Sequence, residues 1–167
     1  MIRRALDLEP TLWLSVSATG RAPRHGEREG IDYFFVTPKD FETMVEQGRM
    51  LEWATFAGNL YGTPREPVES QLASGRSVIL EIDLAGARQV RANVPEAVLV
   101  FLEPPSFDEL ERRLRGRGTE DAATIGRRLE IAQTELAATS EFDYVVVNAD
   151  VQETAARLVS LATAPAA

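Results

Sequence analysis

The apolar residues of this chain fall into short runs separated by helical stretches. Three near-continuous runs, typical of strands covered on both faces, span residues 78–83, 97–102 and 144–147. Residues 12–17 and 31–36 are two further strand candidates. The alternation of strands with helices predicts an α/β fold with a parallel sheet and right-handed crossovers.

Several helix boundaries can be read from capping residues. Thr37, Thr63 and Ser106 each stand three positions before an acidic residue, a pattern that predicts a helix start. Apolar residues at helical spacing predict two more helices: the tail of an amphipathic helix that ends before Pro10, and a helix over residues 122–138.

Turn residues separate several of the predicted strands. A loop of Gly, Pro and Arg is expected from Ala18 to Gly30. Residues 50–57 and 60–62 predict a small hairpin or a mixed sheet around Gly58 and Asn59.

Composition limits the classes of function. With 167 residues, 44% of them apolar, the chain is about one domain long. It has no cysteine, which excludes disulfides, thiolate metal sites and cysteine nucleophiles and fits a cytoplasmic protein. The single histidine, His25, excludes a His-rich metal site. No apolar run approaches the ~20 residues of a membrane span, and no signal-peptide core follows the N-terminus.

Charge narrows the picture further. A formal net charge of -8 has the wrong sign for general binding to nucleic acid or to an anionic membrane, so any phosphate site must be local. Seventeen of the 18 basic residues are arginine, and the single lysine, Lys39, follows Pro38 rather than a glycine loop. The P-loop pattern G-x-x-x-x-G-K-[ST] is therefore absent from the printed chain.

A local phosphate site is suggested by two arginines that follow a strand end. Arg21 and Arg24 lie in the segment Ser15-Val16-Ser17-Ala18-Thr19-Gly20-Arg21-Ala22-Pro23-Arg24-His25-Gly26-Glu27. Arginine forks match phosphate oxygens, and ligands of open α/β sheets bind outside the carboxyl ends of the strands. The alternative is an ordinary solvated surface loop.

This segment is similar to the GMP-binding loop of guanylate kinases, S-x-S-x-T-T-R-x-P-R-x-G-E. The resemblance continues in the family's order through the rest of the chain, including the stretches Leu51-Glu52-Trp53-Ala54, Gly58-Asn59-Leu60-Tyr61-Gly62-Thr63, Leu80-Glu81-Ile82-Asp83, Arg113-Leu114-Arg115-Gly116-Arg117-Gly118-Thr119 and Phe142-Asp143-Tyr144. It implies phosphoryl transfer from ATP to GMP, with Mg²⁺ accompanying ATP. It leaves dGMP usage and the oligomeric state open.

The resemblance also implies roles for individual residues on the GMP side. The residues that would clamp the GMP phosphate are Arg21, Arg24, Tyr33 and Tyr61. Glu52 would accept hydrogen bonds from the ring N–H and amino group of guanine, with further base contacts from Ser17 and Thr63. Adenine presents an acceptor where guanine presents that donor, so Glu52 should reject AMP.

The remaining implied residues lie between the nucleotides or on the ATP side. Glu81 and Asp83 are two apart on a predicted strand end, and the alternative is a strand that simply reaches solvent. Arg113, Arg117 and Arg128 resemble lid arginines that close over ATP, and Asn148 would contact ATP. Without the resemblance, these arginines read as a solvated basic face paired with nearby glutamates.

Glycines around Arg117 suggest how such a lid would move. Gly116 and Gly118 flank this arginine and predict a hinge. The resemblance then implies one domain over 1–167, with a GMP-binding subdomain at about 18–75 and a lid at about 113–128.

In that family a P-loop precedes the first helix, and this chain opens inside what looks like the end of that helix. The fold expected for the printed sequence is thus a parallel-sheet P-loop kinase fold that lacks its first strand and its P-loop. For the 167 residues alone we expect GMP binding at best and very poor kinase activity. One hypothesis is that the natural protein is longer. The other hypotheses are a non-catalytic module that binds GMP or a protein, and a kinase of another small phosphate acceptor.

Overall fold

The computed structural model describes residues 1–56, 58–116 and 121–164. The chain divides into two compact units, each of which is described by itself. The N-terminal unit comprises Leu6–Ala97 together with the last residues of the chain, and the C-terminal unit comprises Met1–Ala5 and Val98–Ser160.

A four-stranded mixed sheet forms the centre of the N-terminal unit. Its strands, in the order β3-β2-β5-β4, are β3 (Phe34–Phe35), β2 (Ala18–Thr19), β5 (Asn59–Pro64) and β4 (Met50–Phe56). β4 and β5 form the predicted hairpin, in which Gly58 has a φ of 77°. Only glycine adopts this left-handed conformation without a steric penalty, which explains its position in the tight connection.

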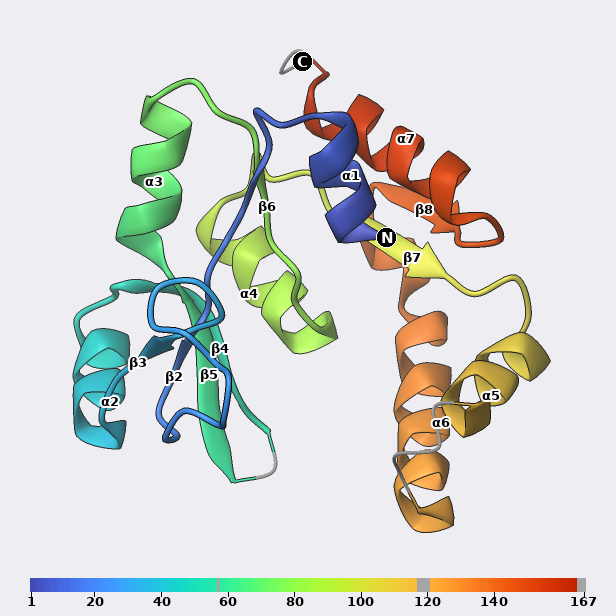
Figure 1. Ribbon diagram of the computed structural model, residues 1–167, viewed down its shortest axis with the longest axis horizontal. Coiled ribbons are helices and arrows are strands. Elements are labelled where there is room, and N and C mark those ends of the chain that lie inside the picture. Colours follow the sequence, from blue (N-terminus) through green and yellow to red (C-terminus); the bar gives the residue numbers. More distant parts are fainter. Residues whose placement is uncertain (57, 117–120, 165–167) are drawn as a thin grey trace. The chain divides into compact units, whose positions relative to one another are not determined.

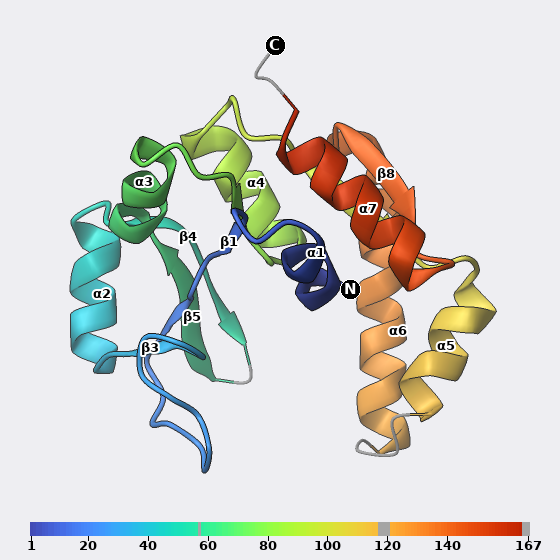
Figure 2. The ribbon, with the colours of Figure 1, turned by 45° about the horizontal axis from the view of Figure 1, so that its top comes forward.

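Helices and a parallel strand pair complete this unit. They are β1 (Trp13–Leu14), α2 (Pro38–Glu46), α3 (Arg65–Ala73), β6 (Val78–Ile79) and α4 (Leu84–Asn93). β1 pairs in parallel with β6. α2 lies beside the mixed sheet (Figure 2), because the fully buried ring of Phe41 packs there with Ala18 and Met50 in a small apolar core.

The strands differ in length from the sequence predictions, whereas the first predicted helix cap is present. Residues 18–19 form β2 rather than the beginning of a loop, because Ala18 and Thr19 pair with both β3 and β5. The strands predicted at 12–17, 31–36 and 78–83 are each reduced to two residues. Thr37 caps α2 as predicted, and its hydroxyl accepts the Asp40 N–H at 3.1 Å.

The predicted cap at Thr63 is wrong. α3 begins at Arg65 after Pro64, without a side-chain cap, and Thr63 is the fully buried penultimate residue of β5. Its hydroxyl donates instead to the carboxylate of Glu52 at 2.6 Å. A buried carboxylate requires donors, and this requirement takes the hydroxyl away from the helix terminus.

The C-terminal unit is built around a two-stranded parallel sheet (Figure 1). Its elements are β7 (Val100–Glu103), α5 (Phe107–Gly116), α6 (Ala122–Ala137), a 3₁₀ turn (Thr139–Glu141), β8 (Tyr144–Val147) and α7 (Val151–Ala162). The start of α1 (Ile2–Leu8) joins it, because Arg4 donates to Gln152 of α7 at 2.6 Å. The helices predicted before Pro10, after Ser106 and over 122–138 are confirmed.

The prediction that all three apolar runs are covered on both faces is wrong for β8. Tyr144, Val145 and Val147 are 42–51% exposed, and β8 pairs with β7 alone among the described strands.

In the described parts of the chain, no helix is both long enough and apolar enough to cross a membrane.

Candidate functional site

Arg21 is the centre of a polar network in the loop that follows β2. Its Nη1 and Nη2 each donate to one carboxylate oxygen of Glu27 at 2.7 Å, and its Nε donates to the Tyr61 hydroxyl at 3.1 Å. Nη1 also donates to the backbone oxygen of Ala22 at 3.0 Å. These contacts raise the pKa of Arg21 above its already high ordinary value, chiefly through the bond to Glu27.

Aromatic rings surround the same guanidinium. Its central carbon lies 5.1 Å from the ring centre of Tyr33 and 5.9 Å from that of Phe35. The rings of Tyr33 and Tyr61 are 6.0 Å apart. The charge is therefore held by cation–π contacts as well as by hydrogen bonds, and two phenol groups lie beside it.

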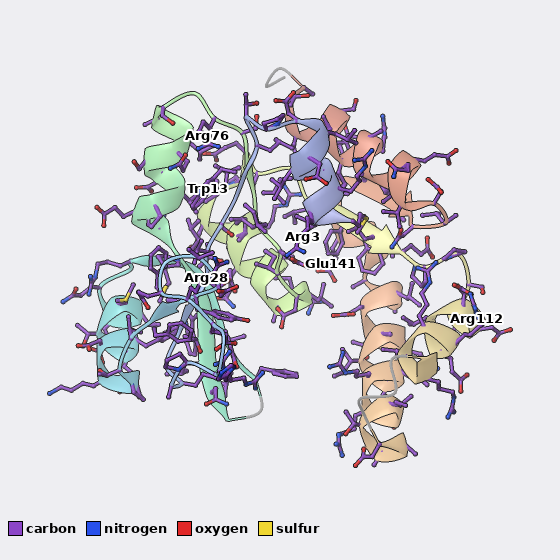
Figure 3. The ribbon with its side chains drawn as sticks, viewed as in Figure 1. Arg3, Trp13, Arg28, Arg76, Arg112 and Glu141 are labelled. Atoms are coloured by element: carbon purple, nitrogen blue, oxygen red, sulfur yellow. The ribbon has the colours of Figure 1, made fainter. Side chains whose placement is uncertain are left out.

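Glu27 fixes the shape of this loop in addition to holding Arg21. Its carboxylate accepts the backbone N–H of Arg24 at 2.7 Å, and its own N–H donates to the Arg24 carbonyl at 3.1 Å. The Arg21 guanidinium, followed by the Arg24 N–H, lowers the pKa of Glu27 to about 2. The Arg24 side chain is exposed, and its charge also contributes to the lowered pKa of Glu27. Arg28, labelled in Figure 3, pairs with Asp32 instead.

A buried carboxylate lies across the β4–β5 hairpin. Glu52 on β4 pairs in register with Thr63 on β5 and is only 6% exposed. Thr63 donates to its Oε1 at 2.6 Å. Burial raises the pKa of Glu52 above its ordinary value, the Thr63 hydroxyl lowers it, and the charge of Asp83 raises it. Such a buried acceptor is suited to reading N–H donors on a ligand.

The first turn of α4 closes over this carboxylate. A Cβ atom added at Gly86 would lie 2.8 Å from Glu52 Oε2, closer than real Cβ atoms approach, and 3.2 Å from Ile82 Cβ, which is a tight contact. The absence of a side chain at Gly86 is therefore what admits the carboxylate. Asp83 caps the helix and accepts the Gly86 N–H at 2.8 Å.

The two polar clusters are connected through one strand. Tyr61 and Thr63 are two residues apart on β5, so their side chains leave the same face of the strand. Two residues of a strand span about 7 Å. The same face of β5 therefore presents Tyr61, which belongs to the network around Arg21, and Thr63, which bonds to the buried carboxylate. A ligand with an anionic group at one end and N–H donors at the other matches this arrangement.

The other predicted residues of this unit have less defined surroundings. Ser17 is partly buried directly before β2, and its carbonyl accepts the Phe34 N–H at 2.9 Å. Glu81 and Asp83 are exposed and do not end a strand as predicted, because β6 stops at Ile79 and they lie in the connection to α4. Within the described residues, no group of three or more His, Cys, Asp and Glu side chains is arranged to hold a metal ion.

In the C-terminal unit, Arg113 and Asn148 lie together. Arg113 donates to the Asn148 carbonyl at 3.3 Å and to Glu109 at 2.7 Å. Its neighbour Arg112, labelled in Figure 3, is 77% exposed and also pairs with Glu109. Helix ion pairs, one of the two predicted interpretations of these arginines, are thus present in α5.

The other two predicted lid arginines are Arg128 and Arg117. Arg128 is partly buried on α6. Gly116, the first residue of the predicted hinge, is the last residue of α5, whereas Arg117 and the rest of that hinge, Gly118 and Thr119, lie outside the described residues.

Comparison with known proteins places this geometry. The structure resembles the crystal structure of a guanylate kinase from Anaplasma phagocytophilum, with a TM-score of 0.73 and 37% identity, covering 95% of this chain and 78% of that one. The likeness shows the class of fold, which is the α/β fold of P-loop kinases.

Sequence comparison then identifies the family. The family model described as "Guanylate kinase" matches residues 7–164. The guanylate kinase of Thermobifida fusca is 58% identical over 93% of this chain and 80% of its own length. That of Parasynechococcus marenigrum is 55% identical over 96% and 88%, respectively. This chain therefore belongs to the guanylate kinase family, and the predicted family and fold class are confirmed.

The sequence predicted a role for most residues of the two clusters but not for Phe35, Glu27 or Gly86. Glu27 appeared only as the last letter of the loop pattern, although an acid six residues after Arg21 is a signal for a paired arginine. Gly86 gave no signal at all, because the need for space arises from Glu52, 34 positions earlier in the chain.

Proposed function

We propose that this chain binds GMP in the N-terminal unit as the acceptor of a phosphoryl group from ATP. Family membership supports the reaction, and the geometry supports the acceptor. Tyr61 and Thr63 lie on one face of β5, with Arg21 bonded to the first and the buried Glu52 bonded to the second. This arrangement is the single observation that carries the proposal.

The phosphate end of GMP binds to Arg24, Arg21, Tyr61 and Tyr33. Arg24 is exposed and supplies a movable positive charge. Tyr61 accepts the Arg21 Nε–H, which leaves its own hydroxyl proton directed elsewhere and able to donate to an anion. Charge-assisted bonds of this kind are stronger than neutral ones.

The guanine end binds to Glu52, with Ser17 and Thr63 as further base contacts. Thr63 holds Oε1, which fixes the carboxylate, and the N–H donors of guanine supply the partners that a buried carboxylate lacks. Adenine would place an acceptor against the same oxygen, so AMP is rejected.

ATP is the phosphoryl donor, and the C-terminal unit supplies its candidate contacts: Arg113, Arg117, Arg128 and Asn148. The transfer needs positioning and charge stabilisation, because the attacking oxygen belongs to GMP itself. We extend the proposal to a GMP-binding subdomain over residues 18–75 and a lid over residues 113–128.

Mg²⁺ that accompanies ATP would offset phosphate charge. The exposed carboxylates of Glu81 and Asp83 fit such an ion, since Mg²⁺ uses one or two carboxylates and substrate phosphates rather than a protein cage.

Titration calorimetry of the 167-residue chain tests the acceptor. GMP should bind, while AMP and a sugar phosphate should bind much more weakly. Equal affinity for GMP and the sugar phosphate would show that Glu52 reads no base, and the acceptor would then belong to another class.

A further inference from the structure

Glu27 makes an unusual number of contacts for a residue on an exposed loop. Its two carboxylate oxygens accept three hydrogen bonds of 2.7 Å: from Nη1 and Nη2 of Arg21 and from the Arg24 backbone N–H. The side chains of Arg21 and Glu27 are only 10% and 19% exposed. A single carboxylate thus determines both the guanidinium position of one arginine and the backbone turn that carries the other.

The Arg21 donors show what remains for a ligand. Of the five N–H groups of an arginine, four have partners here: two on Glu27, one on Ala22 and one on Tyr61. Glu27 takes the outer edge formed by the two terminal nitrogens. The fifth N–H therefore belongs to Nη2 and lies on the Nε edge, beside the Tyr61 hydroxyl.

Because Glu27 already occupies the two terminal nitrogens of Arg21, it can have either of two roles when a phosphate binds. As a competitor, Glu27 would have to leave before phosphate binds, and its removal would tighten GMP binding. As a positioning residue, Glu27 would stay, and phosphate would bind at the Nε edge. The Arg24 N–H favours the second role, because release of Glu27 would break the loop turn as well as the ion pair.

We propose that Glu27 is a positioning residue for the GMP phosphate, which holds Arg21 by its outer edge so that the Nε edge and the Tyr61 hydroxyl face the ligand. The inference rests on the proposed function. The two arginines then have different roles. Arg21 is held in place and its charge is neutralised by Glu27, whereas the exposed Arg24 supplies the positive charge that contacts the phosphate.

The test compares Glu27→Gln with Glu29→Gln in titration calorimetry of the full chain with GMP. Both changes remove one negative charge from the same loop. Among the described residues, the Glu29 carboxylate accepts only the Phe35 N–H at 2.9 Å, which an amide oxygen still accepts. At position 27 the amide NH₂ faces an Arg21 nitrogen, donor against donor. Glu27→Gln should weaken GMP binding about tenfold, and Glu29→Gln should not weaken it.

Guanosine, which lacks phosphate, separates positioning from folding of the loop. Its affinity should be the same in the unchanged chain and in Glu27→Gln. In an Arg21→Lys background, Glu27→Gln should have little further effect on GMP, since the residue acts through the arginine fork. Equal losses for GMP and guanosine, or full additivity with Arg21→Lys, would overturn the inference.

The outcomes also distinguish this inference from the proposed function. Tighter or unchanged GMP binding by Glu27→Gln would reject the positioning role and leave the GMP site standing, provided that Arg24→Ala weakens binding. If Arg24→Ala had no effect, or if the unchanged chain did not bind GMP, the phosphate site itself would be wrong.

Discussion

The substitution Gly86→Ala tests whether the guanine site depends on space left by a missing side chain. The added Cβ would lie 2.8 Å from Glu52 Oε2, 3.3 Å from Glu52 Cδ and 3.2 Å from Ile82 Cβ. Comfortable contacts begin near ~3.5 Å, so the carboxylate must move by roughly 0.5 Å or more. Its bond to Thr63, at 2.6 Å, restricts that movement.

The magnitude follows from two opposing effects. Overpacking of a tight interior contact costs about 1–3 kcal/mol. Replacing glycine by alanine in a helix returns at most ~1 kcal/mol. If the full helix gain is realised, the net loss is at most about 2 kcal/mol, which lowers Tm by up to roughly 8 °C for a protein of this length. A displaced carboxylate also loses guanine hydrogen bonds, each worth about 1.5–3 kcal/mol, so GMP affinity should fall by roughly 10- to 100-fold.

Gly126→Ala is the matched control, because Gly126 lies within α6 and a Cβ there meets no atom within 4 Å. This variant should gain Tm and keep its GMP affinity. Thermal unfolding and GMP titration of both variants check the prediction. Gly86→Ala with a raised Tm and unchanged GMP affinity would refute the close approach of α4 to Glu52.

Three further predictions concern the two ends of the ligand. Glu52→Gln should reduce the preference for GMP over AMP by at least about tenfold, measured by competition binding, since an amide offers both a donor and an acceptor. The same variant reports on pH. Burial raises the pKa of Glu52 above its ordinary value of 4.5. The contribution of this residue to folding stability is therefore fully present below pH 4.5, and it is lost as the pH rises through the raised pKa. The Tm of Glu52→Gln relative to the unchanged chain should therefore increase between pH 4 and 7, and a constant difference would contradict the assignment. Arg24→Ala should weaken GMP binding by roughly tenfold or more, with little change in Tm, because the Arg24 side chain is exposed to solvent.

Local signals in the sequence determined much of the N-terminal unit. The cap at Thr37, the hairpin around Gly58 and the α/β alternation depend on neighbours within a few residues, so the pattern alone predicts them. The spacing of Arg21 and Arg24 in one loop was likewise visible, and the resemblance to guanylate kinases supplied a role for each of them.

Tertiary structure decided which donors these residues use. Thr63 carries a helix-cap signal, yet its hydroxyl binds Glu52, because burial makes an unsatisfied carboxylate more costly than an uncapped helix. Arg21 reads as a free phosphate fork, yet four of its N–H groups are already bonded. The space above Glu52 depends on Gly86, 34 residues further along the chain. Contacts of this kind arise only when strands and helices distant in sequence meet, and the burial that results sets their energies.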